Sequence, residues 1–161
     1  MSAEVHVKGL SELQRLLDQL PAKIEKNVMR GAMRAGAKPI LVEAKARVPV
    51  ESGELRDGLK IKTSGRGSRV VASVRATGPH AFLANFFEYG TSPHLIPGPL
   101  AIGQGFVQGV EHPGISARPF LRPAMDAKTR EAVVAAGNYI KKRLATKHGL
   151  DTADIDIGGG E

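Results

Sequence analysis

Five histidines have the widest chemical reach in this chain, because imidazole can ligate a metal ion or transfer a proton near neutral pH. They are His6, His80, His94, His112 and His148. No two of them stand three or four positions apart, the spacing that places two ligands on one face of a helix. The one carboxylate at such a spacing is Asp151 after His148, and Gly149 between them favours a helix end. We therefore interpret the histidines as scattered loop or surface residues and expect no metal.

Patterns for catalysis or cofactor binding are equally weak. Gly103, Gly105 and Gly109 do not fit the GxGxxG pattern of dinucleotide sites, and the sequence shows neither a Walker motif nor GxSxG. Glu88 beside Tyr89 could act as a general base only with a second site residue, and the sequence names none. We therefore expect a protein without enzyme activity or cofactor, and we interpret the glycines as loop flexibility.

Size and composition favour one domain with a light core. The chain has 161 residues, 4% aromatic residues and no tryptophan, so its core must rest on Ala, Val, Leu and Ile. The absence of cysteine excludes disulfides and cysteine-zinc sites, and it is compatible with a reducing cytoplasm. No apolar run approaches the roughly 20 residues that span a bilayer, and a signal-peptide pattern is absent. We expect a soluble, unprocessed protein with no membrane partner.

The charge is uneven along the chain. The net charge is +7, but the last eleven residues contain four acids and no Lys or Arg, so residues 1–150 carry +11. Such a body favours an acidic partner, either nucleic acid or the acidic face of another protein. A nucleic-acid-binding module is therefore the alternative hypothesis. The basic residues of the predicted helix at 21–47 are also explained by a solvated outer face, and no aromatic or Asn/Gln reading pattern accompanies them.

Apolar periodicity predicts three helices. The first covers 10–20, with Ser11 as its cap and Gln14 completing a capping box. The second covers 21–47, with a kink or break near Lys38 because Pro39 lacks a backbone N–H. The third contains Pro123 in its first turn and ends at Gly149. The predicted inner stripe of the second helix is Ile24, Val28, Ala32, Ala35 and Val42, and that of the third is Met125, Ala132, Val133, Ala136, Ile140 and Leu144.

The remaining segments indicate an α+β fold. Residues 59–76 predict an antiparallel hairpin, and 81–89 is interpreted as a strand, although its short apolar run could equally be a turn or two of helix. We predict one small antiparallel sheet of three to four strands, packed against the long helix of the N-terminal half and the C-terminal helix. Residues 1–150 are predicted to form a single connector domain, and 151–161 a mobile acidic, glycine-containing tail.

The segment at 92–116 is too long for an ordinary connection. It contains four prolines and five glycines, and a loop of this length is usually functional, disordered or supplied with its own small structure. Residues 100–102 and 106–107 could form two strands around the glycines at 103 and 105, so we predict a projecting hairpin. Its apolar residues are expected to contact a partner or another copy. They are Leu95, Ile96, Leu100, Ile102, Phe106 and Val107.

Four segments, in this order and spacing, resemble a family of neck, head-tail connector or tail-completion proteins, the tail components of long-tailed bacteriophages. They read VPVESGELRDGLKI at 48–61, FFEYGTSPH at 86–94, HPG at 112–114 and ARPFLRPAMD at 117–126. The family typically shows Pro-Val-Asp-Thr-Gly-x-Leu after a long helix, then Glu-Phe/Tyr-Gly-Thr, then Pro-Phe-Leu-Arg-Pro-Ala opening the last helix. Here Glu51 replaces Asp and Ser52 replaces Thr. Serine keeps the capping hydroxyl, whereas glutamate is a poorer turn former than aspartate.

The resemblance, over roughly residues 5–145, implies a structural virion protein at the head-tail junction of a phage or phage-like particle. It implies a ring, a hexamer, between the head-side connector and the tail tube or tail terminator, assembled in the host cytoplasm, with DNA passing through its channel. No catalysis is implied. The motif residues are expected mainly to hold the fold. They are Pro49, Ser52, Gly53, Leu55, Glu88, Gly90, Thr91, Pro119, Phe120, Leu121, Arg122 and Pro123.

Overall fold

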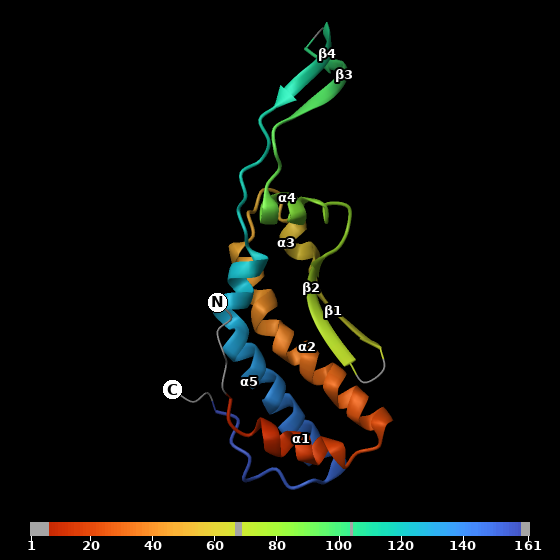
Figure 1. Cartoon of the computed structure of the whole chain (residues 1–161), viewed down its shortest axis with the longest axis vertical. Coiled ribbons are helices and arrows are strands. Elements are labelled where there is room, and N and C mark those ends of the chain that lie inside the picture. The colour runs from red at the N-terminus through yellow and green to blue at the C-terminus, as the bar shows by residue number, and fades with distance from the viewer. Residues whose placement is uncertain (1–6, 67–68, 104, 159–161) are drawn as a thin grey trace.

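The computed structural model describes residues 7–66, 69–103 and 105–158 of an elongated α+β chain (Figure 1). Two long helices form its body, a hairpin lies along one of them, and a second hairpin projects from one end. The elements in chain order are α1 (Leu10–Asp18), α2 (Ala22–Arg47), α3 (Glu54–Gly58), β1 (Leu59–Arg66), β2 (Arg69–Ala76), α4 (Leu83–Tyr89), β3 (His94–Ile102), β4 (Gly105–His112) and α5 (Leu121–His148). Within these residues, no helix is long and apolar enough to cross a membrane.

Helices α2 and α5 pack closely and antiparallel. A Cβ on Gly36 would come within 2.7 Å of the Ala132 carbonyl oxygen, and one on Gly31 would overlap the Tyr139 ring. The later residue of α2 thus contacts the earlier residue of α5, so the two helices run antiparallel. Helix α2 continues through Pro39, so the predicted kink or break does not end it. Proline removes one backbone hydrogen bond, and burial of Gly36 and Ala44 on either side holds both halves in place.

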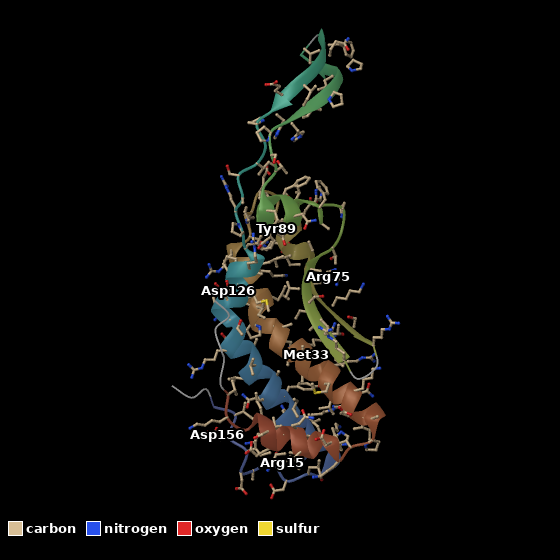
Figure 2. All side chains as sticks on the ribbon, viewed as in Figure 1. Arg15, Met33, Arg75, Tyr89, Asp126 and Asp156 are labelled. Atoms are coloured by element: carbon tan, nitrogen blue, oxygen red, sulfur yellow. The ribbon has the colours of Figure 1, made fainter. Side chains whose placement is uncertain are left out.

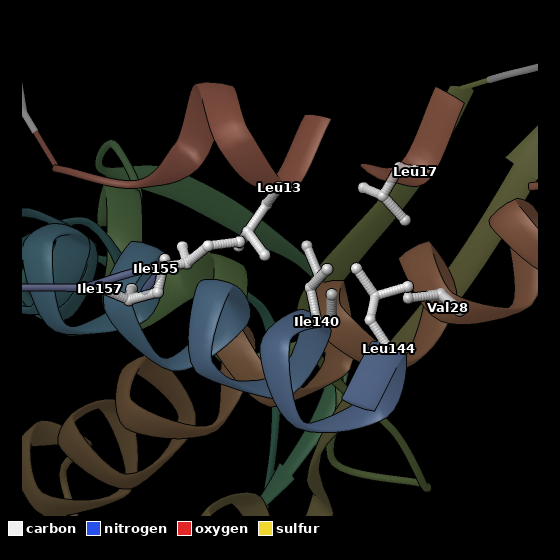
Figure 3. Close-up of a cluster of buried hydrophobic side chains, with 8 residues drawn as sticks. Leu13, Leu17, Val28, Ile140, Leu144, Ile155 and Ile157 are labelled. Carbon is white, nitrogen blue, oxygen red and sulfur yellow. The ribbon is translucent and has the colours of Figure 1, made fainter. Parts of the chain in front are cut away.

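The core is divided into two clusters at opposite ends of the helix pair. The first joins α1, the start of α2 and the end of α5, with Leu13, Leu17, Val28, Ile140 and Leu144 at its centre (Figure 3). The second lies near the start of α5. It contains Ala44, Val48, Leu55, Leu59, Ala84, Phe120 and Ala124. The predicted core of small aliphatic residues is therefore present, with Phe120 as the one buried aromatic side chain among the described residues.

The C-terminal segment, for which the sequence predicted a mobile tail, contributes two side chains to the core. Ile155 and Ile157 are 8% and 7% exposed and belong to the first cluster. Alternation with Asp154 and Asp156 lets the two isoleucines point inward while the acids stay outside. Ile155 and Ile157 supply buried apolar area, which the acidic composition of the segment did not indicate. The proposed division of the chain at residue 150 stays a prediction.

The strands of the described residues form two separate two-stranded sheets, so the predicted single sheet of three to four strands is wrong. Strands β1 and β2 pair from Leu59 opposite Ala76 to Arg66 opposite Arg69, and this hairpin packs on α2. The expected third strand at 81–89 contains helix α4 instead. Its buried residues Ala84 and Glu88 are four apart, which is the helical period. The short apolar run concealed that period.

Several helix details also differ from the sequence predictions. Helix α1 begins after Gly9, which adopts φ +78°, and the Ser11 hydroxyl contacts Glu12 instead of capping the helix. Val42 is 68% and Met125 58% exposed, so neither belongs to the inner stripe, and Ala124 occupies the position predicted for Met125. The end of α5 at Gly149, in the left-handed region, is as predicted.

Candidate assembly site

The arm, defined here as residues 92–116, is a β-hairpin that extends away from the helices (Figure 1). Strands β3 and β4 pair antiparallel from His94 opposite His112 to Ile102 opposite Gly105, with a shift in register between Pro97 and Leu100. The predicted projecting hairpin is therefore present, and its strands are longer than the sequence indicated. Pro97 and Pro99 lie in β3 of a two-stranded ribbon, where a strand has a free edge and no central ladder is broken.

Large apolar side chains of the arm lie in solvent (Figure 2). Phe106 is 77% exposed and Leu95 is 64% exposed, while Val107 and also Val110, which the sequence prediction omitted, are each 36% exposed. Ile96 and Leu100 are half-buried, and the side chain of Ile102 lies outside the described residues. Between 92 and 116 the one residue charged at neutral pH is Glu111. The arm is therefore an apolar, nearly uncharged surface on a basic protein.

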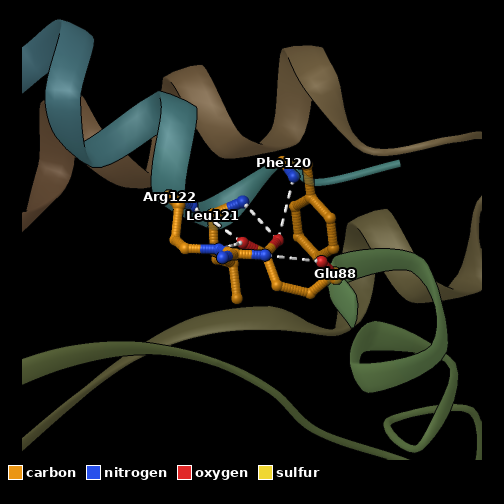
Figure 4. A network of polar contacts seen from close by, with 4 residues as sticks. All are labelled: Glu88, Phe120, Leu121 and Arg122. Atoms are coloured by element: carbon orange, nitrogen blue, oxygen red, sulfur yellow. Dashed lines mark hydrogen bonds and ion pairs between the residues drawn. The ribbon is translucent and has the colours of Figure 1, made fainter. Parts of the chain in front are cut away.

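The arm is anchored by a buried carboxylate at the start of α5 (Figure 4). Glu88 is 3% exposed, and its Oε2 accepts hydrogen bonds from the backbone N–H groups of Phe120 and Leu121, both at 2.9 Å. Its Oε1 accepts from the backbone N–H of Arg122 at 3.1 Å and from Arg122 Nε at 2.9 Å. A helix start leaves such N–H groups without partners and favours negative charge. Glu88 therefore caps α5 from 33 residues away.

The environment of Glu88 favours its charged form. Burial acts to raise the pKa of this carboxyl, but hydrogen bonds from the N–H groups of Leu121 and Phe120 and from Arg122 outweigh burial, so the pKa lies below its ordinary value. Arg122 also donates from Nη2 to the Glu88 carbonyl oxygen at 2.8 Å, and its guanidinium lies 4.9 Å from the centre of the Tyr89 ring. These contacts fix α4 to the start of α5.

The two chains of the arm are tied together where they leave the body. Thr91 and Ile115 exchange backbone hydrogen bonds of 2.9 and 3.2 Å, and the Thr91 hydroxyl also accepts from the Ile115 N–H. Gly90 adopts φ +72°, and a Cβ there would lie 2.6 Å from the Ile115 carbonyl oxygen. A side chain at 90 would therefore be strained and would clash. The arm has a fixed base, directly joined to the Glu88 cap.

The three predicted motifs meet at this end of the molecule. Phe120 is fully buried, Leu55 is buried, and Gly53 has φ +84°, as expected for a core anchor and a left-handed glycine. The Ser52 hydroxyl accepts a hydrogen bond from the Glu54 N–H at 3.4 Å. A pocket brings residues of the first motif together with Phe87, which precedes Glu88, and Arg118, which precedes Pro119. Its lining includes Pro49, Ser52, Gly53, Leu55, Phe87 and Arg118.

The histidines are mostly apart, with one exception that the sequence did not indicate. His94 and His112 pair across the arm, with ring centres 5.1 Å apart, whereas His80 contacts Glu54 at 2.8 Å. His6 lies outside the described residues. Within the described ranges, no group of three or more His, Asp, Glu or Cys side chains is arranged to hold a metal ion. The buried polar contacts at this end of the molecule are those of Glu88 with the start of α5.

Lowering the pH is expected to remove the stabilisation by Glu88. Its folded pKa lies below the ordinary value of 4.5, so its contribution is fully present above about pH 4.5 and is lost as pH falls through the folded pKa. The difference in free energy of unfolding between wild type and Glu88→Gln should therefore shrink between about pH 7 and about pH 3 in urea titrations. Other carboxylates, including Glu12 and Asp57, are common to both proteins. A constant difference would contradict this assignment.

Comparison with known proteins found one family. Residues 11–90 match the family described as "Bacteriophage HK97-gp10, putative tail-component". The match includes the motifs at Pro49–Leu55 and Glu88–Gly90 and stops before the arm. It confirms the resemblance inferred from the sequence and supports a structural protein among phage tail components. Searches of curated proteins and of solved structures found no match.

Proposed function

We propose that this chain, whose residues 11–90 match the HK97-gp10-like family of bacteriophage tail components, is a ring subunit of the head-tail junction. The ring, proposed as a hexamer, joins the head-side connector to the tail tube or tail terminator, and DNA passes through its channel. The chain performs no catalysis and uses no cofactor. Assembly takes place in the cytoplasm of the bacterial host, and the finished protein belongs to the virion.

The observation that carries the proposal is the exposed, firmly anchored arm. Phe106 and Leu95 are largely exposed on a segment that joins neither core cluster. A contiguous apolar surface on a soluble subunit usually marks a contact with another protein. Because Glu88 and the bridge between Thr91 and Ile115 fix the base of the arm, little orientational freedom is lost when a partner covers it. We infer that neighbouring subunits or the adjoining neck protein cover the arm.

Electron microscopy of particles from a strain that lacks this gene tests the proposed function. Filled heads and tails should accumulate separately, or the tails should end abnormally, because the part that joins them is missing. A strain complemented with the wild-type gene is the control and should contain joined particles. Normal joined particles in the deletion strain would exclude the junction role.

A further inference from the structure

The outward face of the β1–β2 hairpin is strongly cationic. Along β1 and β2, side chains alternate between a face packed on α2 and a face in solvent. Five exposed cations line the solvent face, and we call them the cationic ribbon. They are Lys60, Lys62, Arg66, Arg69 and Arg75. No carboxylate occurs in either strand.

The pairing of the strands sets like charges against each other. Lys60 lies opposite Arg75, and Arg66 lies opposite Arg69. Like charges directly across an antiparallel pair are destabilising. Among the described residues, none of these cations forms an ion pair with a carboxylate. The ribbon of the single chain therefore lacks the anionic partner that its charges require.

The chain carries a complementary surface in its C-terminal segment. Asp151, Asp154 and Asp156 are exposed, and we call them the acidic edge. Burial of the neighbouring isoleucines fixes this edge to α1 and α5. Lys141 Nζ also donates to the Ile155 carbonyl oxygen at 2.6 Å. The carboxylates are thus presented from an anchored segment, and the described residues give them no ion pair.

The two charged surfaces lie on opposite sides of the molecule. The ribbon covers α2 on one side, and Asp156 lies on the other side beyond α5 (Figure 2). In Figure 1 the C-terminal segment runs beneath α1 and reaches the side of α5 that faces away from the β1–β2 hairpin. The surfaces therefore do not meet within one chain. Two different patches on opposite sides are what a head-to-tail contact requires, and such contacts close into rings when the rotation permits.

We propose that the cationic ribbon of one copy binds the acidic edge of the next copy around the ring. This contact gives the three carboxylates of the acidic edge cationic partners on the ribbon, and it explains why one chain combines a basic body with an acidic end. Nucleic acid on the ribbon would leave the acidic edge unpaired, and the ribbon presents no aromatic or amide side chain for stacking or reading bases. The inference rests on the proposed ring and assigns an interface separate from the arm.

The contact is tested in the complemented deletion strain by reversing charges on the ribbon, on the edge, and then on both in one chain. The ribbon variant carries Lys60→Glu and Lys62→Glu, and the edge variant carries Asp154→Lys and Asp156→Lys. Each alone should lower the yield of joined particles by about tenfold or more, because like charges then face each other across the interface. The four changes combined in one chain should restore the yield.

A matched control carries Lys142→Glu and Arg143→Glu, which change the net charge by the same amount at exposed positions of α5. It should assemble like the parent. The ribbon variant should stay folded, because Lys60→Glu places opposite charges across from Arg75. If the ribbon variant fails, the edge variant behaves like the parent and the combination is not rescued, the ribbon binds another polyanion such as DNA, and the proposed contact is wrong.

A cross-linking test is independent of the particle. The chain contains no cysteine, so purified Lys62→Cys and Asp156→Cys chains carry one thiol each. Oxidation of their mixture should give a disulfide dimer containing one chain of each kind, and high salt should suppress it. No dimer, or dimers of like chains alone, would overturn the contact. The mixed dimer together with normal particles in the deletion strain would retain the contact and reject only the junction role.

Discussion

Replacement of Glu88 by alanine is expected to lower the free energy of unfolding by about 1–3 kcal/mol, the range for leaving a buried hydrogen-bonding group without its partner. The side chain is 3% exposed and accepts from three backbone N–H groups of α5 as well as from Arg122. Alanine leaves those donors without their acceptor next to the buried Phe120. Urea unfolding followed by circular dichroism measures the difference at neutral pH.

Glu131→Ala is the matched control for this variant. Glu131 is an exposed glutamate whose carboxylate contacts Lys128 at 2.7 Å on α5. Exposed pairs contribute little, so this change should cost less than about 1 kcal/mol. Equal losses in the two variants would contradict the assignment of Glu88 as the cap of α5. The Glu88→Ala chain should also show faster protease cleavage near residues 90 and 115, since the base of the arm depends on the same contacts.

The helical and hairpin segments were largely predictable, because their signals are local. Leucines at helical spacing predicted α1, the small residues of the second helix predicted close packing, and the glycines at 103 and 105 predicted the turn of the arm. Residues 83–89 were not predictable as a helix, because seven residues give too few turns to separate the two periods. Packing of Ala84 and Glu88 against the start of α5 decides the outcome.

The residues of the site were predictable from the sequence, but the contacts between its distant segments were not. The sequence indicated that Gly90, Phe120 and Pro123 serve the fold; in the structure Gly90 has φ +72°, Phe120 is fully buried and Pro123 lies in the first turn of α5. It gave no sign that the carboxylate of Glu88 meets N–H groups 32 to 34 residues later. Such a contact depends on how two segments fold together. An acid beside a tyrosine suggests a general base as readily as a helix cap until burial and partners are known.

The composition of the two core clusters explains why the arm contributes little to the stability of the folded chain. Neither cluster contains a described residue between 92 and 116, and Phe120 secures the return of the chain to the body. The arm therefore adds exposed apolar area without adding to either core. A segment with this combination is retained for its contacts with other molecules and contributes little to the folding of its own chain. Removal of the arm should consequently affect assembly far more than folding.

Deletion of residues 95–111, with Asn-Gly inserted between His94 and His112, should abolish joined particles and leave the subunit folded. These histidines lie directly opposite each other, so a two-residue turn can close the shortened hairpin. The free energy of unfolding should change by less than about 1 kcal/mol, because both core clusters are intact. Urea unfolding checks the subunit, and electron microscopy of the complemented deletion strain counts joined particles.

Single substitutions separate the apolar surface from the length of the arm. Phe106→Ser should reduce the number of joined particles, whereas Met125→Ser, at a 58% exposed position of α5, should leave it unchanged. Both residues are largely exposed, so neither change removes a core contact, and a difference between them must come from what covers the arm. Wild-type numbers of joined particles from the arm-deleted chain would show that the ring forms without the arm, and the ribbon and edge would then have to supply the interface.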